Sequence, residues 1–285
     1  MQLDGGNLSS VADHDTSAPG DLFATREFTI ARIRYRHRRR CFLMEQRKRS
    51  LLALGAYVRI ELGWSRSLPE KERKKIAALA IAMIKRPVGS ICEEMIVAHK
   101  ASQKPFGRIE NRLEREMKML GESLPVWRAF GSGIRGFGAT SLGVIVAEAG
   151  DLSSYCGRGG HSKLWKRMGL AFMDADGVRQ GGLPKGSSSE AWMAHGYNRR
   201  RRSRMWNIGD ALIKGNRCGK YRTAYLARKS YEMARDPDMT PMHAHRRAQR
   251  YMEKVFLRDL WKEWRRASQT VRESANHSVP AVTLT

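Results

Sequence analysis

Apolar residues recur every three or four positions through most of the chain, which is the spacing of one face of an α-helix. No segment shows the sustained apolar–polar alternation that is typical of a half-buried strand. The pattern therefore predicts an all-α, multi-helix protein. The polar segments 1–25 and 268–285 have little to bury, and we expect a disordered leader and a disordered tail there.

The first predicted helix is long and strongly basic, and it spans residues 26 to about 54. Its apolar stripe consists of Ile30, Ile33, His37, Cys41, Met44 and Leu51, with Leu43 and Leu52 beside it. Arginines crowd the other faces, and like charges at this density repel one another unless a polyanion neutralises them. We therefore expect nucleic-acid contacts from Arg36, Arg38, Arg39 and Arg40. A solvated helical face and a coiled-coil dimer with a basic surface are the alternatives.

Further amphipathic helices are predicted up to residue 122, so that 26–122 forms a basic helical or coiled-coil region. They cover residues 67–86, about 88–100 and about 109–120. The segment 104–107 contains Pro105, and proline in a helix interior removes a hydrogen bond and clashes with the preceding turn. We therefore expect a loop at 104–107.

Glycines mark the next segment, in which the run 133–138 separates a short helix from an apolar helix that stops at Gly150. A glycine turn lets the backbone approach a phosphate closely, and the first amides of the following helix can bind an anion. This arrangement predicts a helix–hairpin–helix that grips a nucleic-acid backbone, and a packing turn without a ligand is the alternative. The expected contact residues are Arg135, Gly136, Phe137 and Gly138.

An arginine run opens the helix predicted over residues 197–213. Positive charge at a helix N-terminus opposes the helix dipole, so helix stability does not account for the run, whereas a bound phosphate does. We expect nucleic-acid contacts from Arg199, Arg200, Arg201, Arg202 and Arg204. Two further helices are predicted over about 218–234 and 242–267.

The charge balance indicates that this helical protein has a polyanionic partner. The chain has 285 residues, with 53 Lys and Arg against 28 Asp and Glu, so its formal net charge is +25. Such a chain attracts polyanions and releases their counterions on binding. The four cysteines form no CxxC pair, which is typical of a reducing cytosol, and we see neither a signal-peptide pattern nor a membrane-spanning run. We therefore expect DNA or RNA in the cytoplasm as the partner and no membrane association.

Several short motifs follow one another in a fixed order between residues 124 and 266. They are Leu124-Pro125, the run 133–138, Ala147-Glu148-Ala149-Gly150-Asp151-Leu152, Lys163-Leu164-Trp165, Met168-Gly169-Leu170 and Gly196-Tyr197-Asn198-Arg199-Arg200-Arg201. In this order the region 123–267 resembles the C-terminal half of the insertion-sequence 110/116/902 transposase family. The resemblance implies a bacterial, nucleoid-associated DNA recombinase that acts with a guide RNA. Its expected partners are DNA, a guide RNA and further copies of the chain.

The chain departs from that family in two places. Family members begin with a RuvC-like domain that carries four metal-binding carboxylates, and the first hundred residues lack a comparable strand pattern. No cofactor or metal site is therefore evident, and magnesium enters only if a RuvC-like partner supplies its site. The family also places a nucleophilic serine in the loop before the basic helix, where this chain has Arg179-Gln180-Gly181-Gly182. Ser187, Ser188 and Ser189 lie a few residues further on and are the candidate catalytic residues.

Three functions stay open at this point, and whether the protein is an enzyme is left undecided. The first is a DNA-binding protein of transposase type that takes part in transposition or recombination, in a reduced form without its own metal-dependent half. The second is an active serine recombinase that uses the serines at 187–189. The third is a non-catalytic basic helical protein that binds RNA or a protein partner.

Overall fold

The computed structural model describes residues 21–171, 173–175, 178–180, 183, 186–191, 198–215 and 218–277. The described secondary-structure elements are helices apart from two short strands, which confirms the all-α prediction. The helices are α1 (Asp21–Glu61), α2 (Glu70–Lys85), α3 (Glu93–Glu122), α4 (Pro125–Ala129), α5 (Ala139–Ala149), α6 (Gly160–Arg167), α8 (Arg199–Gly215), α9 (Lys220–Arg235) and α10 (Pro241–His277). Short 3-10 turns lie at Gly131–Gly133 and Leu152–Ser154.

The two strands form a small antiparallel pair that the sequence did not predict. β1 (Met173–Ala175) pairs with β2 (Val178–Gln180), and Met173 lies opposite Gln180. Three residues per strand are too few for apolar–polar alternation to be recognised in the sequence.

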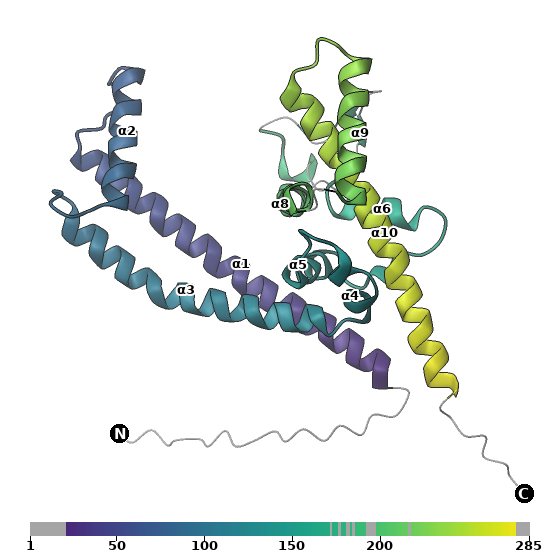
Figure 1. Cartoon of the computed structure of the whole chain (residues 1–285). Helices are drawn as coiled ribbons and strands as arrows, with labels where there is room; N and C mark the ends of the chain where they lie inside the picture. The colour runs from purple at the N-terminus through teal and green to yellow at the C-terminus, as the bar shows by residue number, and fades with distance from the viewer. Residues whose placement is uncertain are drawn as a thin grey trace, which may run out of the picture.

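The long helices α1 and α3 pack against each other and form an arm that carries α2 at its far end (Figure 1). A small apolar cluster holds this end together; it consists of Leu54, Val58, Ala80, Cys92 and Ile96. The other end of α1 enters the main core, where Ile30 and Ile33 are buried. The stripe predicted on α1 is buried at this end, whereas Leu51 and Leu52 further along are exposed.

The predicted loop at 104–107 is wrong, because α3 continues through Pro105. Contacts with α1 lie on both sides of the proline. Ser50 Oγ is 3.4 Å from His99 Nδ1 and accepts a hydrogen bond from Gln103 Nε2 at 3.3 Å. After the proline, Gly107 lies against the Arg47 guanidinium. Packing against α1 therefore overrides the local cost of the proline.

The structure also differs from the prediction at both ends of the chain, because α1 begins at Asp21 and α10 continues to His277. Between Pro241 and Pro280 there is neither glycine nor proline to stop α10. The Ser268 hydroxyl donates to the carbonyl of Trp264 one turn earlier, at 2.8 Å, so this polar side chain is accommodated within the helix. Residues 1–20 and 278–285 of the predicted leader and tail lie outside the described residues.

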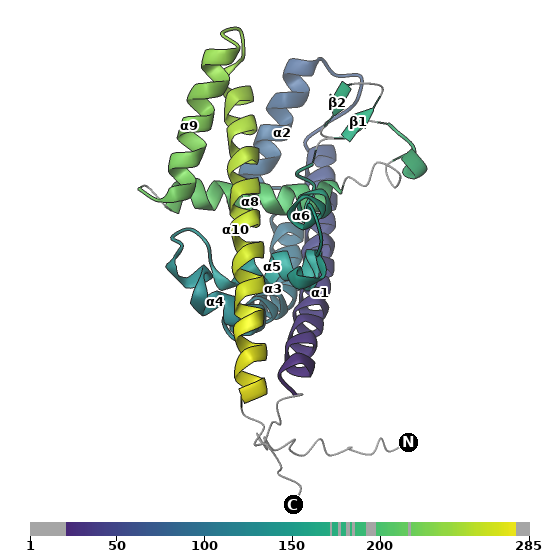
Figure 2. The ribbon, with the colours of Figure 1, turned by 90° about the vertical axis from the view of Figure 1, so that its right-hand side faces the viewer.

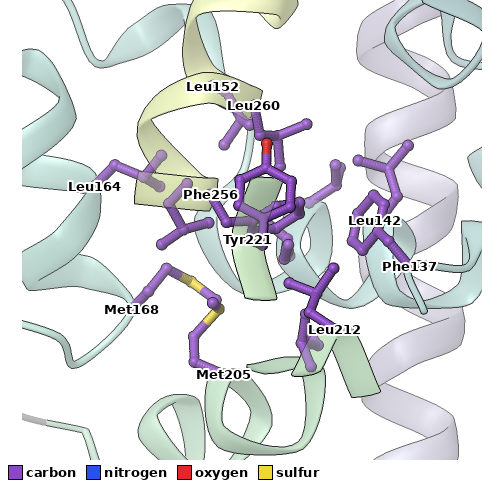
Figure 3. Close-up of a cluster of buried hydrophobic side chains, with 14 of the residues drawn as sticks. Phe137, Leu142, Leu152, Leu164, Met168, Met205, Leu212, Tyr221, Phe256 and Leu260 are labelled. Atoms are coloured by element: carbon purple, nitrogen blue, oxygen red, sulfur yellow. The ribbon is translucent and has the colours of Figure 1, made fainter. Parts of the chain in front are cut away.

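The main core lies where α4, α5, α6, α8, α9 and α10 meet (Figure 3). Phe256 of α10 is at its centre, with the ring of Phe137 at 4.8 Å and the ring of Tyr221 at 5.3 Å between centroids. α8 runs across α10, and its buried residues Met205 and Leu212 belong to this core (Figures 2 and 3). None of the described helices is both long enough and apolar enough to cross a membrane.

Candidate nucleic-acid interface

The N-terminus of α8 is held by Asn198 and Gly169. Asn198 Oδ1 accepts the backbone N–H of Arg201 at 3.1 Å, which satisfies one of the amides that a helix start leaves without a partner. Gly169 has φ +74°, and a Cβ at this position would lie 3.1 Å from Cβ of Arg202. The glycine therefore lets the end of α6 approach the first turn of α8 closely, which fixes the direction in which the arginine run points.

Glutamates from three other helices pair with the arginines of α8. The pairs are Arg200–Glu45 of α1, Arg201–Glu148 of α5 at 3.1 Å and Arg202–Glu253 of α10 at 2.7 Å. The sequence interpretation required a bound phosphate to offset this positive charge at a helix start. The protein's own carboxylates meet that requirement at three of the positions.

Burial separates the arginines of this run into two groups. The side chains of Arg201 and Arg202 are only 19% and 12% exposed, so they are largely occupied with their carboxylates. Arg199 and Arg200 are exposed at the surface. Arg204 is half-buried and donates to the Sγ of Cys41 at 3.0 Å. Within the run, Arg199 and Arg200 are therefore the residues best placed to meet a ligand.

The predicted arginines of α1 divide in the same way. Arg36 and Arg40 pair with glutamates of α3, each at 2.9 Å, and so hold the arm together. Arg38 and Arg39 are exposed. The guanidinium of Arg39 lies 5.4 Å from the ring centroid of Tyr35, also on α1.

An open depression of about 480 Å³ lies between α1, α5, α6 and α8. Arginines from three helices line it, and they are Arg34, Arg38, Arg167, Arg200 and Arg201. Two carboxylates also line it, Glu45 and Glu148, so positive charge is in excess. The depression brings together Arg38, Arg200 and Arg201 from the predicted set, and adds Arg34 and Arg167 to them.

His37, Cys41 and Glu148 form the floor of this depression. His37 Nε2 lies 3.0 Å from Glu148 Oε1 and 3.4 Å from Cys41 Sγ. Burial lowers the pKa of His37, but the hydrogen bonds to Cys41 and Glu148 outweigh it and the pKa is raised. Burial raises the pKa of Glu148, but His37 and Arg201 together lower it to about 2. Glu148 is therefore ionised at neutral pH and fixes Arg201 in place.

The floor does not have the geometry of a catalytic triad. Both contacts of the His37 ring use Nε2, and its buried Nδ1 has no hydrogen-bond partner among the described residues. A triad needs the base to contact the nucleophile through one ring nitrogen and the orienting carboxylate through the other. Burial raises the pKa of the Cys41 thiol, but His37 and Arg204 outweigh it, so the thiol pKa is lowered. These residues thus organise charge beneath the arginines.

The glycine turn packs against α8. Gly136 has φ +84°, and a Cβ there would overlap the carbonyl oxygen of Ala211. Phe137 is buried against Phe256. The close backbone approach that glycine permits is therefore made to α8 on this side of the turn. Arg135 and Gly138 are exposed, and the helix–hairpin–helix grip on nucleic acid stays a prediction.

The candidate catalytic serines lie in a short described segment, residues 186–191. Ser188 Oγ accepts the backbone N–H of Ala191 at 3.1 Å, which caps a helical turn, and Ser189 is exposed. Ser187 is half-buried. The nucleophilic role of the three serines stays a prediction, and Gly196 and Tyr197 of the family motif lie outside the described residues.

No group of three or more His, Cys, Asp or Glu side chains placed to hold a metal ion occurs in the described parts of the chain. The magnesium expected from a RuvC-like partner stays a prediction.

The sequence interpretation missed the glutamates that pair with the arginines. Glu253 follows Met252 and precedes Phe256, so it lies on a helix face that is otherwise buried. Glu148 likewise ends the apolar stretch 142–147. A lone carboxylate on an apolar face predicts a buried cationic partner, since an unpaired buried charge is very costly. That signal was present in the sequence.

Comparison of this chain with protein-family models, curated proteins and solved structures finds no match.

Proposed function

We propose that this protein binds the phosphate backbone of DNA in the depression between α1, α5, α6 and α8. The observation that carries the proposal is the convergence of five arginines from three separate helices around one open depression. Cationic side chains that surround a concave surface focus the potential there and raise the local concentration of a polyanion. The formal net charge of +25 adds a long-range attraction to the same partner.

The geometry supports recognition of the backbone. Arg34 and Arg38 are four residues apart on α1 and therefore lie on one face, one helical turn from each other. Arg200 approaches from α8 on another side of the same depression. Guanidinium groups pair well with phosphate oxygens, and such contacts position nucleic acid without reading its sequence. We infer that binding is only weakly dependent on DNA sequence.

The resemblance to the insertion-sequence 110/116/902 family supplies a biological setting for this binding. In that setting the protein grips DNA during transposition or recombination. The motif Ala147-Glu148-Ala149-Gly150-Asp151-Leu152 supports this extension, because its Glu148 fixes Arg201 at the floor of the depression.

The test is a double variant, Arg34→Ala with Arg38→Ala, which removes two exposed arginines of the depression. Fluorescence anisotropy with a labelled 20-base-pair duplex measures affinity over a range of salt concentrations. We expect affinity to fall about tenfold or more, and the slope of log affinity against log salt to fall by about 0.9 for each phosphate that is no longer neutralised. The arginines of α8 are a poorer target, since Arg201 and Arg202 hold the helix in place.

The matched control removes two exposed arginines from the arm, Arg112 and Arg115 of α3. It lowers the net charge by the same amount away from the depression. An equal loss of affinity in both double variants would show that binding follows net charge alone, and the proposed site would then be wrong.

A further inference from the structure

A second basic pocket lies on the pair of helices α9 and α10, which stand side by side beyond α8 (Figures 1 and 2). Its volume is about 330 Å³, which is within the range of about 300–1,000 Å³ that is typical of ligand pockets. The residues that line it are Arg228, Glu232, Arg235, Arg247, Arg250, Tyr251 and Lys254. Five cationic side chains thus surround one carboxylate, and the pocket carries a large excess of positive charge.

The single carboxylate holds two of the cations in fixed positions. Glu232 is buried and accepts a hydrogen bond from Arg228 Nε at 2.7 Å and from Arg247 Nη1 at 3.2 Å. Burial raises the pKa of Glu232, but the two arginines outweigh it, so the pKa is lowered and the group is ionised at neutral pH. One negative charge cannot neutralise two guanidinium groups. The pocket is therefore prearranged for a further anion.

Aromatic rings border the same cations. The guanidinium of Arg228 lies 4.6 Å from the ring centroid of Tyr231 and 5.1 Å from that of Tyr251. The side chain of Tyr251 lines the pocket and is 43% exposed. Exposed aromatic rings beside a cationic groove are the combination that binds single-stranded nucleic acid, because unpaired bases stack on the rings while the backbone follows the positive charge.

We propose that the α9–α10 pocket binds single-stranded nucleic acid, with a backbone phosphate between Arg235 and Arg247 and an unpaired base on the ring of Tyr251. Bases of a duplex are already stacked on one another and present only their edges, so the ring gives no advantage to duplex binding. The pocket thereby distinguishes single strands from duplex. This site is separate from the depression beside α1 and does not depend on it.

The test compares a labelled 12-nucleotide oligothymidylate with a labelled 20-base-pair duplex in fluorescence anisotropy. Tyr251→Leu removes the ring, and we expect affinity for the single strand to fall about tenfold while affinity for the duplex changes less than about twofold. Arg235→Ala should lower the salt slope for the single strand by about 0.7, the value for one phosphate contact. Tyr251→Phe keeps the ring and should retain single-strand affinity.

Tyr35 provides a matched control on α1. It is 54% exposed, and the guanidinium groups of Arg36 and Arg39 lie within 6 Å of its ring, but it lies outside the α9–α10 pocket. Equal losses from Tyr35→Leu and Tyr251→Leu, or an equal loss for duplex and single strand in Tyr251→Leu, would overturn the proposal. If Tyr251→Leu destabilises the fold, Tyr251→Phe becomes the test. A loss of single-strand affinity in Tyr251→Phe as large as that in Tyr251→Leu would also overturn the proposal. The Arg34/Arg38 double variant reports on the depression, so the two proposals can fail separately.

Discussion

The two faces of α8 use arginine in different ways. On the face toward α10, Arg202 pairs with Glu253, whose side chain is fully buried and also accepts a hydrogen bond from Gln249. Burial raises the pKa of Glu253 to about 7 despite the opposing effect of Arg202 and Gln249. On the face toward α1 and α5, Arg201 pairs with Glu148, and the pKa of that carboxyl is lowered to about 2.

The difference shows that the surroundings of the carboxylate, more than the presence of an arginine, determine what the pair contributes. Glu148 has two cationic or hydrogen-bonding partners, His37 and Arg201, at the edge of an open depression. Glu253 is sealed beneath α8, where the loss of water is the larger effect. Adjacent residues of one helix point about 100° apart, so a short arginine run serves both faces. Arg202 on the inner face holds the fold, and on the outer face the exposed Arg200, beside the Arg201–Glu148 pair, is available for a ligand.

We expect the largest loss of stability from Arg202→Ala, measured at pH 8, where Glu253 is ionised. The substitution leaves a buried carboxylate without its guanidinium partner, and the expected loss in the free energy of unfolding is about 3–5 kcal/mol. Urea denaturation followed by circular dichroism measures it. Arg200→Ala removes an exposed pair from the same run and should cost less than about 1 kcal/mol. Similar losses in both variants would contradict the division of α8 into two faces.

A second substitution tests the contact of the glycine turn with the inner side of α8. Gly136→Ala introduces a Cβ that overlaps the Ala211 carbonyl oxygen, at a residue with φ +84°. We expect a loss of about 3 kcal/mol in the free energy of unfolding from overpacking and backbone strain. Gly138→Ala is the control, because a Cβ there meets nothing within 4 Å, and its cost should stay below about 1 kcal/mol. If the Gly136→Ala protein kept its stability but no longer bound DNA, the turn would contact DNA instead of serving to pack against α8.

The smallest effect is a change in pH dependence. The folded-state pKa of Glu253 lies above its ordinary value, so its contribution to stability is fully present below about pH 4.5 and is lost as the pH rises through 7. Between pH 5 and pH 8, the free energy of unfolding of the wild-type protein should therefore fall by about 2 kcal/mol more than that of the Glu253→Gln variant. Urea denaturation at the two pH values measures this difference.

Glu148→Gln serves as the opposite control, because the folded-state pKa of Glu148 is lowered. Its contribution is present above about pH 4.5 and is lost as the pH falls toward 2. Between pH 5 and pH 8, Glu148→Gln should therefore keep the loss that comes from Glu253 and should remove only the part that comes from His37, whose pKa Glu148 helps to raise. If the Glu253→Gln protein kept the full wild-type pH dependence, the titration of Glu253 would lie outside the range from pH 5 to pH 8.

Local features were predictable from the sequence. The apolar period indicated the helical class, the glycine run separated α4 from α5, and Gly150 ended α5 as predicted. The arginine run opens α8 two residues from the predicted start. Each of these rests on neighbouring residues, where spacing and glycine conformation are informative.

Features that depend on distant partners were not predictable in the same way. α3 passes through Pro105 because α1 packs along it, and this contact has no local signal. The pair Arg202–Glu253 joins residues 51 positions apart. Charge and spacing showed that the arginines need anions, but only the packing of α8 between α1 and α10 shows which of those anions belong to the protein itself.

The hydrogen bonds that join α1 to α10 bear on the order in which the protein folds during synthesis. Asp151 accepts hydrogen bonds from Arg26 near the start of α1 and from Trp264 near the end of α10, each at 2.8 Å, and Arg26 also donates to Ser268, 242 residues away. A ribosome delivers Arg26 long before Ser268. Helix α10 must leave the ribosome before Asp151 can accept hydrogen bonds from both α1 and α10. Closure of the fold thus requires α10, and a nascent chain that stalls before α10 leaves uncovered the apolar residues that contact Phe256 in the folded core.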